Sequence, residues 1–498
     1  MLKFRSFFLY ALAFLSGAIL PLGLAPFRWW PCGLLSPAFL LGLNLYRPIS
    51  PLKGALLGLW YGLGLFGIGV SWVFVSIHEF GMTPVPLALL ITVGFVLVLS
   101  LFTSFQNYCF IRWNSTLPSH SALLLFPAWW VIFEWLRSWV FSGFPWAFLG
   151  VTQLSSSLKY YAPLGSVYLV SWLVALCAGA LYLLWIGNNK TRLWSVSLVT
   201  LIWGGSAVLP SIHWTTPCGP NHTVTFIQSN ITPFDKFTSA EPLKSTWQHY
   251  IEPTLQHWAD LVLWPEGAIP IPLPESKALL EDLDSIAKNK KSTLITGIAI
   301  IEQEKIYNSL IAVGAGQGFY HKHHLVPFGD YLPFENHLRG LINFFNLPMS
   351  SFNSGSLMQA PLRSNRFTLA GYICYEIAFP DLIRATLHDA KVIINLSEDG
   401  WFGRSFGPPQ HLDLARMRAL ETGRYVLRAT TSGITAVINE QGDIMAQAPP
   451  FQAAILKSHF REMQGTTPWV RMGSTPFIIL LFLFIFISVI YNRIKKGI

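Results

Sequence analysis

Long apolar runs alternate with short polar breaks along the first 212 residues. Seven of these runs come close to the roughly 20 residues that a membrane-spanning helix needs. They cover residues 7–24, 31–46, 54–76, 85–111, 121–141, 161–187 and 193–211, and an eighth run covers 475–491. This pattern predicts a membrane domain of seven transmembrane helices at 1–212. It also predicts a C-terminal transmembrane helix with a short tail at 471–498.

Between residues 213 and 470 the apolar runs shorten to the length of strands. Segments 261–267, 367–374 and 391–397 have the composition of buried strands, and 275–289 and 411–423 suit helices. Strand-like and helix-like segments that alternate in this way predict an α/β domain. The chain is therefore expected to combine a polytopic helical membrane domain with an α/β domain.

Composition supports insertion into a membrane. Of the 498 residues, 52% are hydrophobic and 12% are charged, whereas about a quarter are charged in soluble proteins. The formal net charge of +9 raises the question of nucleic acid. The basic residues do not gather with aromatic residues into one patch, so no nucleic-acid partner is expected. Many of them instead stand at the ends of apolar runs.

These basic residues predict an orientation. If each run spans the membrane, the Lys and Arg residues within 3–5, 47–53, 112, 190–192 and 493–496 lie on one side. The short loops on the other side contain only Arg28 and Lys159. Because positive charge accumulates on the cytoplasmic side, both termini are expected there. Residues 213–470 then face the outer side, where the surroundings can be oxidising.

Two features of the apolar runs have competing explanations. Gly54, Gly58 and Gly62 recur at every fourth residue, which lets helices approach closely, although glycine is also common in membrane helices generally. Glu134 and Arg137 lie one helical turn apart. Ionisable groups at membrane depth often have a function, but pairing at this spacing is a structural explanation. We favour the structural role on the basis of this pairing, and the absence of a long series of ionisable residues argues against a transporter or a proton relay.

Three residues that end predicted elements suggest one kind of chemistry. Glu266 ends LVLWPE, Lys322 follows a short aromatic stretch, and Cys374 ends FTLAGYIC. A thiolate can attack a carbonyl, a carboxylate can move the proton, and an ammonium can stabilise the oxyanion. The alternative for Cys374 is a disulfide with Cys218. That bond would leave the glutamate and the lysine unexplained.

A metal site is a second alternative in the same region. His321 and His323 would share one face of a strand, opposite Lys322. Two histidines can contribute to a zinc site, but no suitably spaced carboxylate or cysteine completes one. We therefore expect neither a metal nor another cofactor.

The ordered motifs WPEG, HKHHLVPFGDYLP, GYICYE and NLSEDGWFGRS resemble the nitrilase, or carbon–nitrogen hydrolase, superfamily. Members of that superfamily use a Glu-Lys-Cys triad on an α-β-β-α sandwich. The longer stretch GPPQHLDLARMRALETGRYVLRATTSGITAV, together with the eight apolar runs, resembles the apolipoprotein N-acyltransferase family. The resemblance covers essentially the whole chain and is strongest in its second half. It implies a nitrilase-like catalytic domain at 213–470.

The resemblance also implies a reaction. Such enzymes move a fatty acyl chain from a membrane phospholipid to the N-terminal amine of diacylglyceryl-cysteine lipoproteins, the last step of lipoprotein maturation. Cys374 would carry the chain as a thioester, Glu266 would be the general base and acid, and Lys322 would stabilise the oxyanions. The partners are a phospholipid, a diacylated lipoprotein and the bilayer of a bacterial inner membrane, and a monomer suffices.

Further residues receive supporting or substrate-binding roles from the same resemblance: Asp330, Tyr375, Glu376, Phe237, Trp401 and Phe402. Glu376 would support the triad, and Trp401 and Phe402 would line the acyl pocket. Three positions depart from the family pattern. Asp330 stands where glutamate is usual, Phe237 where tryptophan is frequent, and Glu398 where asparagine is usual.

Two rival functions remain open. A membrane-tethered amidase of the nitrilase type would use water as the acceptor, and the triad alone does not distinguish it. A membrane scaffold with a nitrilase-like binding domain belongs to another class. Loss of a triad residue would indicate a scaffold, and all three residues are present.

Overall fold

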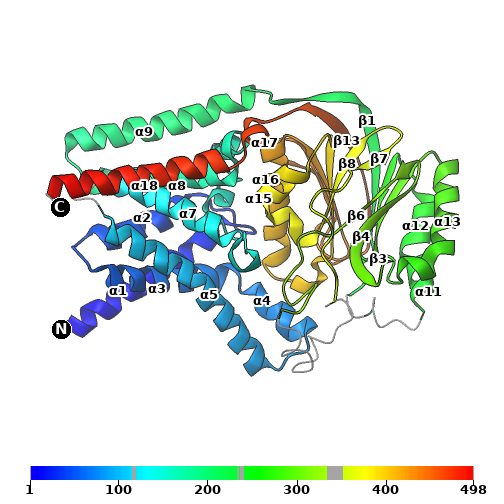
Figure 1. The fold of residues 1–498 in the computed structure, drawn as a ribbon, viewed down its shortest axis with the longest axis horizontal. Coiled ribbons are helices and arrows are strands. Elements are labelled where there is room, and N and C mark those ends of the chain that lie inside the picture. The colour runs from blue at the N-terminus through cyan, green and yellow to red at the C-terminus, as the bar shows by residue number, and fades with distance from the viewer. Residues whose placement is uncertain are drawn as a thin grey trace. The chain divides into compact units, whose positions relative to one another are not determined.

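The structure is a computed structural model, and it describes residues 2–114, 119, 121–232, 235, 241–333 and 351–496. The chain forms two compact units. The helical unit contains Met1–Val73, Pro86–His213 and Thr467–Ile498. The sheet unit contains Trp214–Thr466 together with the short segment Phe74–Val85, which comes from between two apolar helices (Figure 1).

Helices occupy all eight of the predicted apolar runs. They are α1 (Leu2–Ile19), α2 (Pro31–Leu45), α3 (Pro51–Gly69), α5 (Val85–Arg112), α7 (Phe126–Arg137), α8 (Ala162–Ile186), α9 (Asn189–Val208) and α18 (Thr475–Lys496). Within the described residues, four segments are long and apolar enough to cross a membrane: Pro51–Gly69, Val85–Arg112, Ser157–Ile186 and Asn189–Ser211. Shorter apolar helices occur at Phe7–Gly23, Pro31–Leu45 and Thr475–Tyr491.

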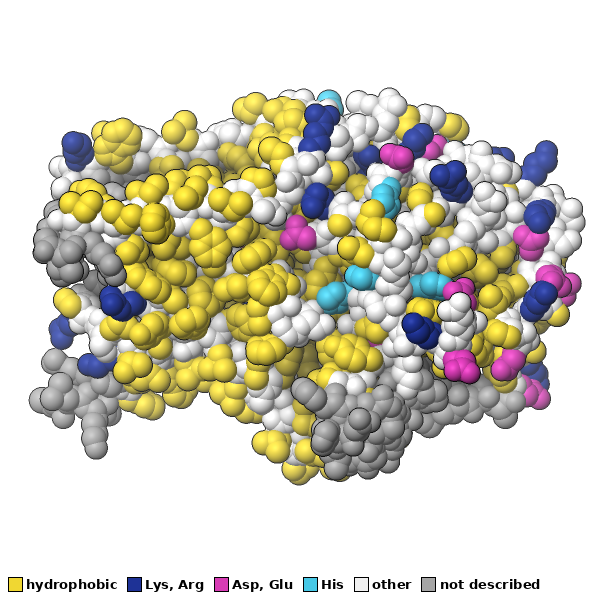
Figure 2. Space-filling view, in the orientation of Figure 1, with side chains coloured by type: hydrophobic (Ala, Val, Ile, Leu, Met, Phe, Trp, Pro, Cys, Tyr) yellow, Lys and Arg dark blue, Asp and Glu magenta, His cyan; other side chains and the backbone are white. Residues whose placement is uncertain are grey.

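The helical unit exposes hydrophobic side chains to its surroundings. Figure 2 shows an extensive yellow surface over this unit. Large exposed side chains include Leu90 and Leu101 of α5 and Phe486 and Ile487 of α18. Soluble proteins rarely expose apolar patches of this extent, whereas lipid accepts them without cost. The surface therefore suits a bilayer.

The glycine pattern of α3 allows close packing against α5. A Cβ atom on Gly58 would lie 2.3 Å from the Thr103 carbonyl oxygen, and one on Gly62 would lie 2.2 Å from the Thr103 hydroxyl. The Thr103 hydroxyl donates a hydrogen bond to the Gly58 carbonyl at 2.9 Å. Close approach, rather than the general frequency of glycine, therefore explains this stripe.

Glu134 and Arg137 bind the irregular segment that follows α7. The Glu134 carboxylate accepts a hydrogen bond from the Leu149 backbone N–H at 2.7 Å. The Arg137 guanidinium donates to the carbonyls of Phe144 and Trp146. Non-helical backbone inside a membrane domain needs such partners, because no water is there to satisfy it. These contacts support the structural role predicted for both residues.

The sheet unit contains two sheets. Among the described residues, the first has six strands in the order β13-β1-β2-β3-β4-β6, and the second has seven in the order β12-β11-β10-β9-β8-β7-β5. The first sheet comprises β1 (Thr215–Gln228), β2 (Leu261–Leu263), β3 (Thr293–Glu302), β4 (Lys305–Gly314), β6 (Phe319–His321) and β13 (Ala454–Gly465). The second comprises β5 (Gly316–Gln317), β7 (Leu362–Ser364), β8 (Thr368–Ile373), β9 (Val392–Ser397), β10 (Tyr425–Thr430), β11 (Ala436–Ile438) and β12 (Ile444–Gln447).

Hydrophobic side chains fill the space between the two sheets. The central cluster joins Phe226 and Leu263 of the first sheet to Ile373, Leu396 and Leu427 of the second. All six residues of β9 are buried. Such continuous apolar runs are typical of parallel strands that are covered on both faces, and β9 is parallel to both β8 and β10.

Helices cover the outer face of each sheet. The first sheet is covered by α11 (Pro242–Thr246), α12 (Glu252–Gln256) and the amphipathic α13 (Leu273–Asn289), and the second by α15 (Pro380–Thr386) and α16 (Gly407–Thr422), as Figure 1 shows. On the inner side of α13, Leu280 and Leu283 pack against Val262 and Leu294. The result is the α-β-β-α sandwich that the resemblance implies.

Candidate active site

Glu266 lies just beyond the end of β2, at the carboxyl edge of the first sheet. Its Oε1 accepts a hydrogen bond from the Asn308 amide at 2.7 Å, and its Oε2 accepts one from the Glu398 backbone N–H at 2.9 Å. The side chain is buried. A Cβ atom on Gly297 of β3 would lie 2.7 Å from the Glu266 Cα. Only glycine therefore fits beside this turn.

Lys322 follows β6 and points its ammonium group at two carboxylates. Its Nζ lies 2.6 Å from Asp330 Oδ2 and 3.7 Å from Glu266 Oε1, and the side chain is 1% exposed. Burial alone would lower the pKa of Lys322, but the charges of Asp330 and Glu266 outweigh it and raise the pKa above its usual range. The two carboxylates therefore favour the charged form of Lys322.

Asp330 reaches this lysine although its side chain is shorter than the glutamate usual in the family. The reason lies in the turn that carries it. The Val326 backbone N–H donates to Asp330 Oδ2 at 2.7 Å, and the Asp330 backbone N–H donates to the Val326 carbonyl at 2.9 Å. The turn thus brings the carboxylate close to the ammonium of Lys322.

Cys374 lies at the end of β8 on a sharp turn. Its φ is +51°, a left-handed conformation that costs a residue with a Cβ atom roughly 1–2 kcal/mol. The thiol is free, as are the other four cysteines, so no disulfide joins Cys374 to Cys218. Burial raises the pKa of Cys374, the charge of Glu266 raises it further, and Lys322 opposes both. The balance leaves the pKa of the thiol above its usual value.

Glu376 connects the turn of Cys374 to the segment of Lys322. One oxygen of this buried carboxylate accepts hydrogen bonds from the Tyr320 hydroxyl at 2.8 Å and from the backbone N–H groups of His323 at 2.8 Å and His324 at 3.0 Å. The other oxygen accepts one from the Ile373 N–H at 2.8 Å. Residues on both sides of the site are thereby held by one side chain.

The other predicted residues lie around this centre. The buried Tyr375 ring contacts Phe379 edge-on at 4.9 Å, and the Phe402 ring lies 5.9 Å from that of His411. Trp401 packs edge-on against Phe80 at 6.0 Å. Phe237 lies outside the residues that the structure describes.

Glu398, which replaces a usual asparagine, contributes contacts from both its backbone and its side chain. Its N–H is the second donor to Glu266, while its own carboxylate accepts a hydrogen bond from the Gly400 N–H at 3.1 Å. The Glu398 side chain therefore caps the start of the short turn η11 (Asp399–Phe402).

The histidines beside Lys322 have separate partners. His321 Nδ1 bonds the Ser309 hydroxyl at 2.7 Å, and its ring stacks on Tyr307. His323 Nδ1 lies 2.8 Å from the Gly355 carbonyl oxygen. Over the part of the chain that the structure describes, no three potential ligands from His, Cys, Asp and Glu gather around a metal position.

Three contacts of the site have no signal in the local sequence. Asn308 is one polar residue within β4, and it binds Glu266. Ser76, from the segment Phe74–Val85, donates its hydroxyl to the Trp401 carbonyl at 2.8 Å. His411 Nε2 lies 3.1 Å from the Cys374 carbonyl oxygen. Each pair is distant in the sequence, so only the fold identifies it.

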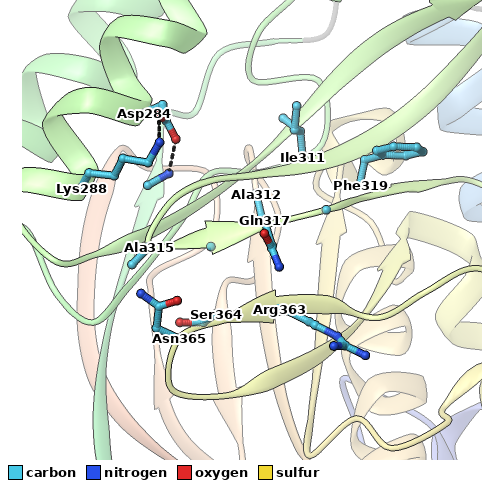
Figure 3. Close-up of a pocket in the computed structure, with 13 residues that line it drawn as sticks. Asp284, Lys288, Ile311, Ala312, Ala315, Gln317, Phe319, Arg363, Ser364 and Asn365 are labelled. Carbon is cyan, nitrogen blue, oxygen red and sulfur yellow. Dashed lines mark hydrogen bonds and ion pairs between the residues drawn. The ribbon is translucent and has the colours of Figure 1, made fainter.

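A groove of about 620 Å³ lies elsewhere on the sheet unit. Figure 3 shows Asp284 and Lys288 of α13 on one side and Arg363 of β7 on another. The Asp284 carboxylate bonds Lys288 Nζ at 2.6 Å and the Gly314 N–H at 2.9 Å. Glu266, Lys322 and Cys374 do not line this groove. It is therefore separate from the candidate active site.

Taken together, the site contains a buried carboxylate, a buried ammonium group paired with carboxylates, and a thiol. Lys322 and Glu266 each act electrostatically on Cys374, with opposite effects on its pKa. Such a set can form and break an acyl–sulfur bond by covalent catalysis.

Comparisons with known proteins identify the families that this chain resembles. The family model described as the apolipoprotein N-acyltransferase N-terminal domain matches residues 16–180, and that of carbon–nitrogen hydrolase matches 223–463. An apolipoprotein N-acyltransferase of Coxiella burnetii is 39% identical over 482 residues, which cover 96% of this chain and 99% of that protein. One from Vibrio cholerae is 40% identical over 476 residues, 92% of each chain.

Among solved structures, the chain is similar to Saccharomyces cerevisiae Nit3, a member of branch 10 of the nitrilase superfamily. The TM-score is 0.37 at 19% identity, and the match covers 48% of this chain and 90% of that one.

Proposed function

The chain belongs to the apolipoprotein N-acyltransferase family, and on that premise we propose that Cys374 carries an acyl chain from a membrane phospholipid to the N-terminal amine of a lipoprotein. As a member of the family it is a bacterial membrane protein and an N-acyltransferase. The proposal assigns the catalytic triad to Glu266, Lys322 and Cys374. The observation that carries it is the meeting of one ammonium group and one buried carboxylate at 3.7 Å, with both charges acting on the thiol of Cys374.

In the first half-reaction, Glu266 takes the proton of the Cys374 thiol, and the sulfur attacks the ester carbonyl of the phospholipid. The electron pair of the carbonyl moves to its oxygen, where the Lys322 ammonium stabilises the negative charge. The tetrahedral intermediate collapses with loss of the lysophospholipid alkoxide, which receives the proton from Glu266. A thioester remains on Cys374.

In the second half-reaction, the free amine of a diacylglyceryl-cysteine lipoprotein attacks the thioester carbonyl. Glu266 takes a proton from the amine, and Lys322 again stabilises the oxyanion. Collapse forms the amide and releases the sulfur of Cys374, which regains the proton. The burial of Glu266 and Lys322 supports this route, because it limits the access of water to the base.

Supporting roles follow from the contacts. Asp330 holds Lys322, Glu376 holds the backbone on both sides of the site, and Trp401 and Phe402 line the path of the acyl chain, with Tyr375 beside them. The distribution of basic residues supports a bacterial inner membrane location with both termini in the cytoplasm and residues 213–470 on the outer face. A single chain contains the complete triad, which supports a monomer.

Intact-mass spectrometry of the full-length protein tests the thioester. The protein is incubated in detergent micelles with phosphatidylethanolamine and phosphatidylglycerol. We expect an added acyl mass that hydroxylamine removes, that Cys374→Ala lacks, and that Cys218→Ala retains. If no adduct forms on the parent protein, or if it persists in Cys374→Ala, the assignment of the nucleophile is wrong.

A further inference from the structure

The backbone of Cys374 is held on both sides. Before it, the N–H of Ile373 donates to the carboxylate of Glu376 at 2.8 Å. After it, the carbonyl oxygen of Cys374 lies 3.1 Å from His411 Nε2 and accepts a hydrogen bond from the Asn395 amide at 3.3 Å. The residue between these contacts has the left-handed φ of +51°.

The two groups around the Cys374 carbonyl come from different elements and share one partner. Asn395 belongs to β9 and His411 to α16. The fully buried guanidinium of Arg428, on β10, donates through Nη1 to the Asn395 side-chain oxygen. Its Nη2 lies 3.0 Å from His411 Nδ1 and 2.6 Å from Asp399 Oδ2. The guanidinium fork thus fixes the orientation of both side chains.

The carbonyl contact places a proton on Nε2 of His411. A carbonyl oxygen only accepts, so Nε2 must carry a hydrogen toward Cys374. Nδ1, on the other side of the ring, lies 3.0 Å from Asp399 Oδ1 and 3.0 Å from Arg428 Nη2, and the hydroxyl of Ser397 donates to Asp399 Oδ1 at 2.8 Å. Burial and the charge of Arg428 lower the pKa of His411, whereas the charge of Asp399 opposes them.

We propose that His411 is a positioning residue for the nucleophile: its Nε2 N–H, oriented by the contacts of Nδ1 with Arg428 and Asp399, holds the carbonyl of Cys374 and so keeps the thiol aimed at Glu266 and Lys322. Asn395 assists at the same carbonyl. The inference rests on the proposed function of Cys374. His411 itself touches neither the sulfur nor the substrate in this account.

The consequence concerns the rate and not the affinity for lipid. A cysteine released from its left-handed turn would relax toward an ordinary β or helical conformation, and its Sγ would move away from the base. Misplacement of a reacting group by about 1 Å can cost on the order of 100-fold in rate. A side chain of similar bulk at this position keeps the surface against which the Phe402 ring packs, so the binding of the phospholipid would be unaffected.

The test compares His411→Met with His411→Gln in the full-length protein. Methionine fills the space without a donor, whereas glutamine offers an amide N–H. Acyl-adduct formation is followed by intact mass against the concentration of phosphatidylethanolamine and phosphatidylglycerol in micelles. We expect the maximal rate of His411→Met to fall about 100-fold at an unchanged half-saturating concentration, and His411→Gln to stay within about tenfold of the parent.

A matched control lies on the same helix. Thr422→Ala removes a buried hydrogen bond, from the Thr422 hydroxyl to the Arg418 carbonyl at 2.7 Å, and should leave the rate unchanged. Asn395→Ala removes the second donor from the Cys374 carbonyl and should slow the maximal rate in the same direction, which keeps the test available if His411→Met does not fold.

Two results would overturn the inference. In one, His411→Met forms the adduct as fast as the parent. In the other, His411→Gln and His411→Met are slowed equally, so that the N–H makes no difference. Both outcomes leave the proposed function intact, because the parent still forms the thioester. A parent protein without any adduct would instead refute the proposed function.

Discussion

At the scale of single residues, the thiol of Cys374 is unusual because its surroundings oppose ionisation. Burial and the charge of Glu266 raise its pKa from an ordinary value of 9.0, and Lys322 only partly offsets this. Many catalytic cysteines are instead stabilised as thiolates near neutral pH. In the proposed reaction, the thiol of Cys374 therefore depends on a base at the moment of attack.

The pH dependence of Cys374 alkylation tests whether the surroundings of the thiol oppose its ionisation. Iodoacetamide reacts with the thiolate, so its rate at Cys374 should rise about tenfold per pH unit through pH 9 without levelling off. Because the folded state favours the protonated form, the stability linked to this thiol is fully present below its ordinary pKa and is lost progressively as the pH rises from that value to the raised one. Lys322→Met should move the curve to still higher pH, and Cys374→Ser provides the blank. A plateau near pH 7 would show a stabilised thiolate and contradict the account.

The residues that the sequence could predict are those that end an apolar run. Glu266 and Cys374 each follow a buried strand, where reactive groups of α/β domains tend to lie. Asn308 and His411 could not be predicted in this way. Each is one polar residue within a strand or a helix, and its partner is brought to it only by the packing of the elements.

At the scale of elements, Glu376 holds the segment after β6 and the end of β8 together. Its carboxylate accepts four hydrogen bonds, three of them from backbone N–H groups. Lys322 and Cys374 lie next to these backbone groups, so the distance between ammonium and thiol depends on this one side chain.

Glu376→Gln should therefore lower both stability and activity. The amide nitrogen cannot accept, and each buried donor left without an acceptor costs about 1–3 kcal/mol. We expect a lower midpoint of thermal unfolding and at least a tenfold slower formation of the acyl adduct. Glu302→Gln, at a half-exposed carboxylate near His321, is the control and should change neither. If Glu376→Gln and the parent have the same midpoint of thermal unfolding and the same rate of adduct formation, the Glu376 carboxylate does not stabilise the site.

The central strands of both sheets could be predicted because they are continuous apolar runs. The strands at the edges of the sheets could not be predicted. β13 has every second residue exposed along its first half and is formed because it pairs in antiparallel fashion with β1, over 200 residues away. The same pairing extends β1 back to Thr215, well before the apolar stretch that begins at Val224. The segment Phe74–Val85 has an apolar composition, and nothing in it predicts that it belongs to the sheet unit.

At the scale of the whole molecule, the chain combines a helical unit that has an apolar surface with a sheet unit that has a buried polar site. The first suits a bilayer, and the second suits covalent acyl transfer. Both substrates of the proposed reaction contain acyl chains, so an enzyme of this kind has to meet them at a membrane. The alternative acceptor, water, would need no such helical unit.

The central claim is that one acyl chain passes through Cys374 between two substrates, and a single-turnover experiment tests it most directly. The acylated full-length protein is separated from phospholipid and mixed with a synthetic diacylglyceryl-cysteine peptide that has a free N-terminus. We predict that the adduct disappears from the protein as an equal amount of N-acylated peptide appears, and that an N-acetylated peptide leaves the adduct in place. If the adduct stays on Cys374, or is lost to water equally fast without the peptide, the thioester is not the intermediate of the transfer and the account is wrong.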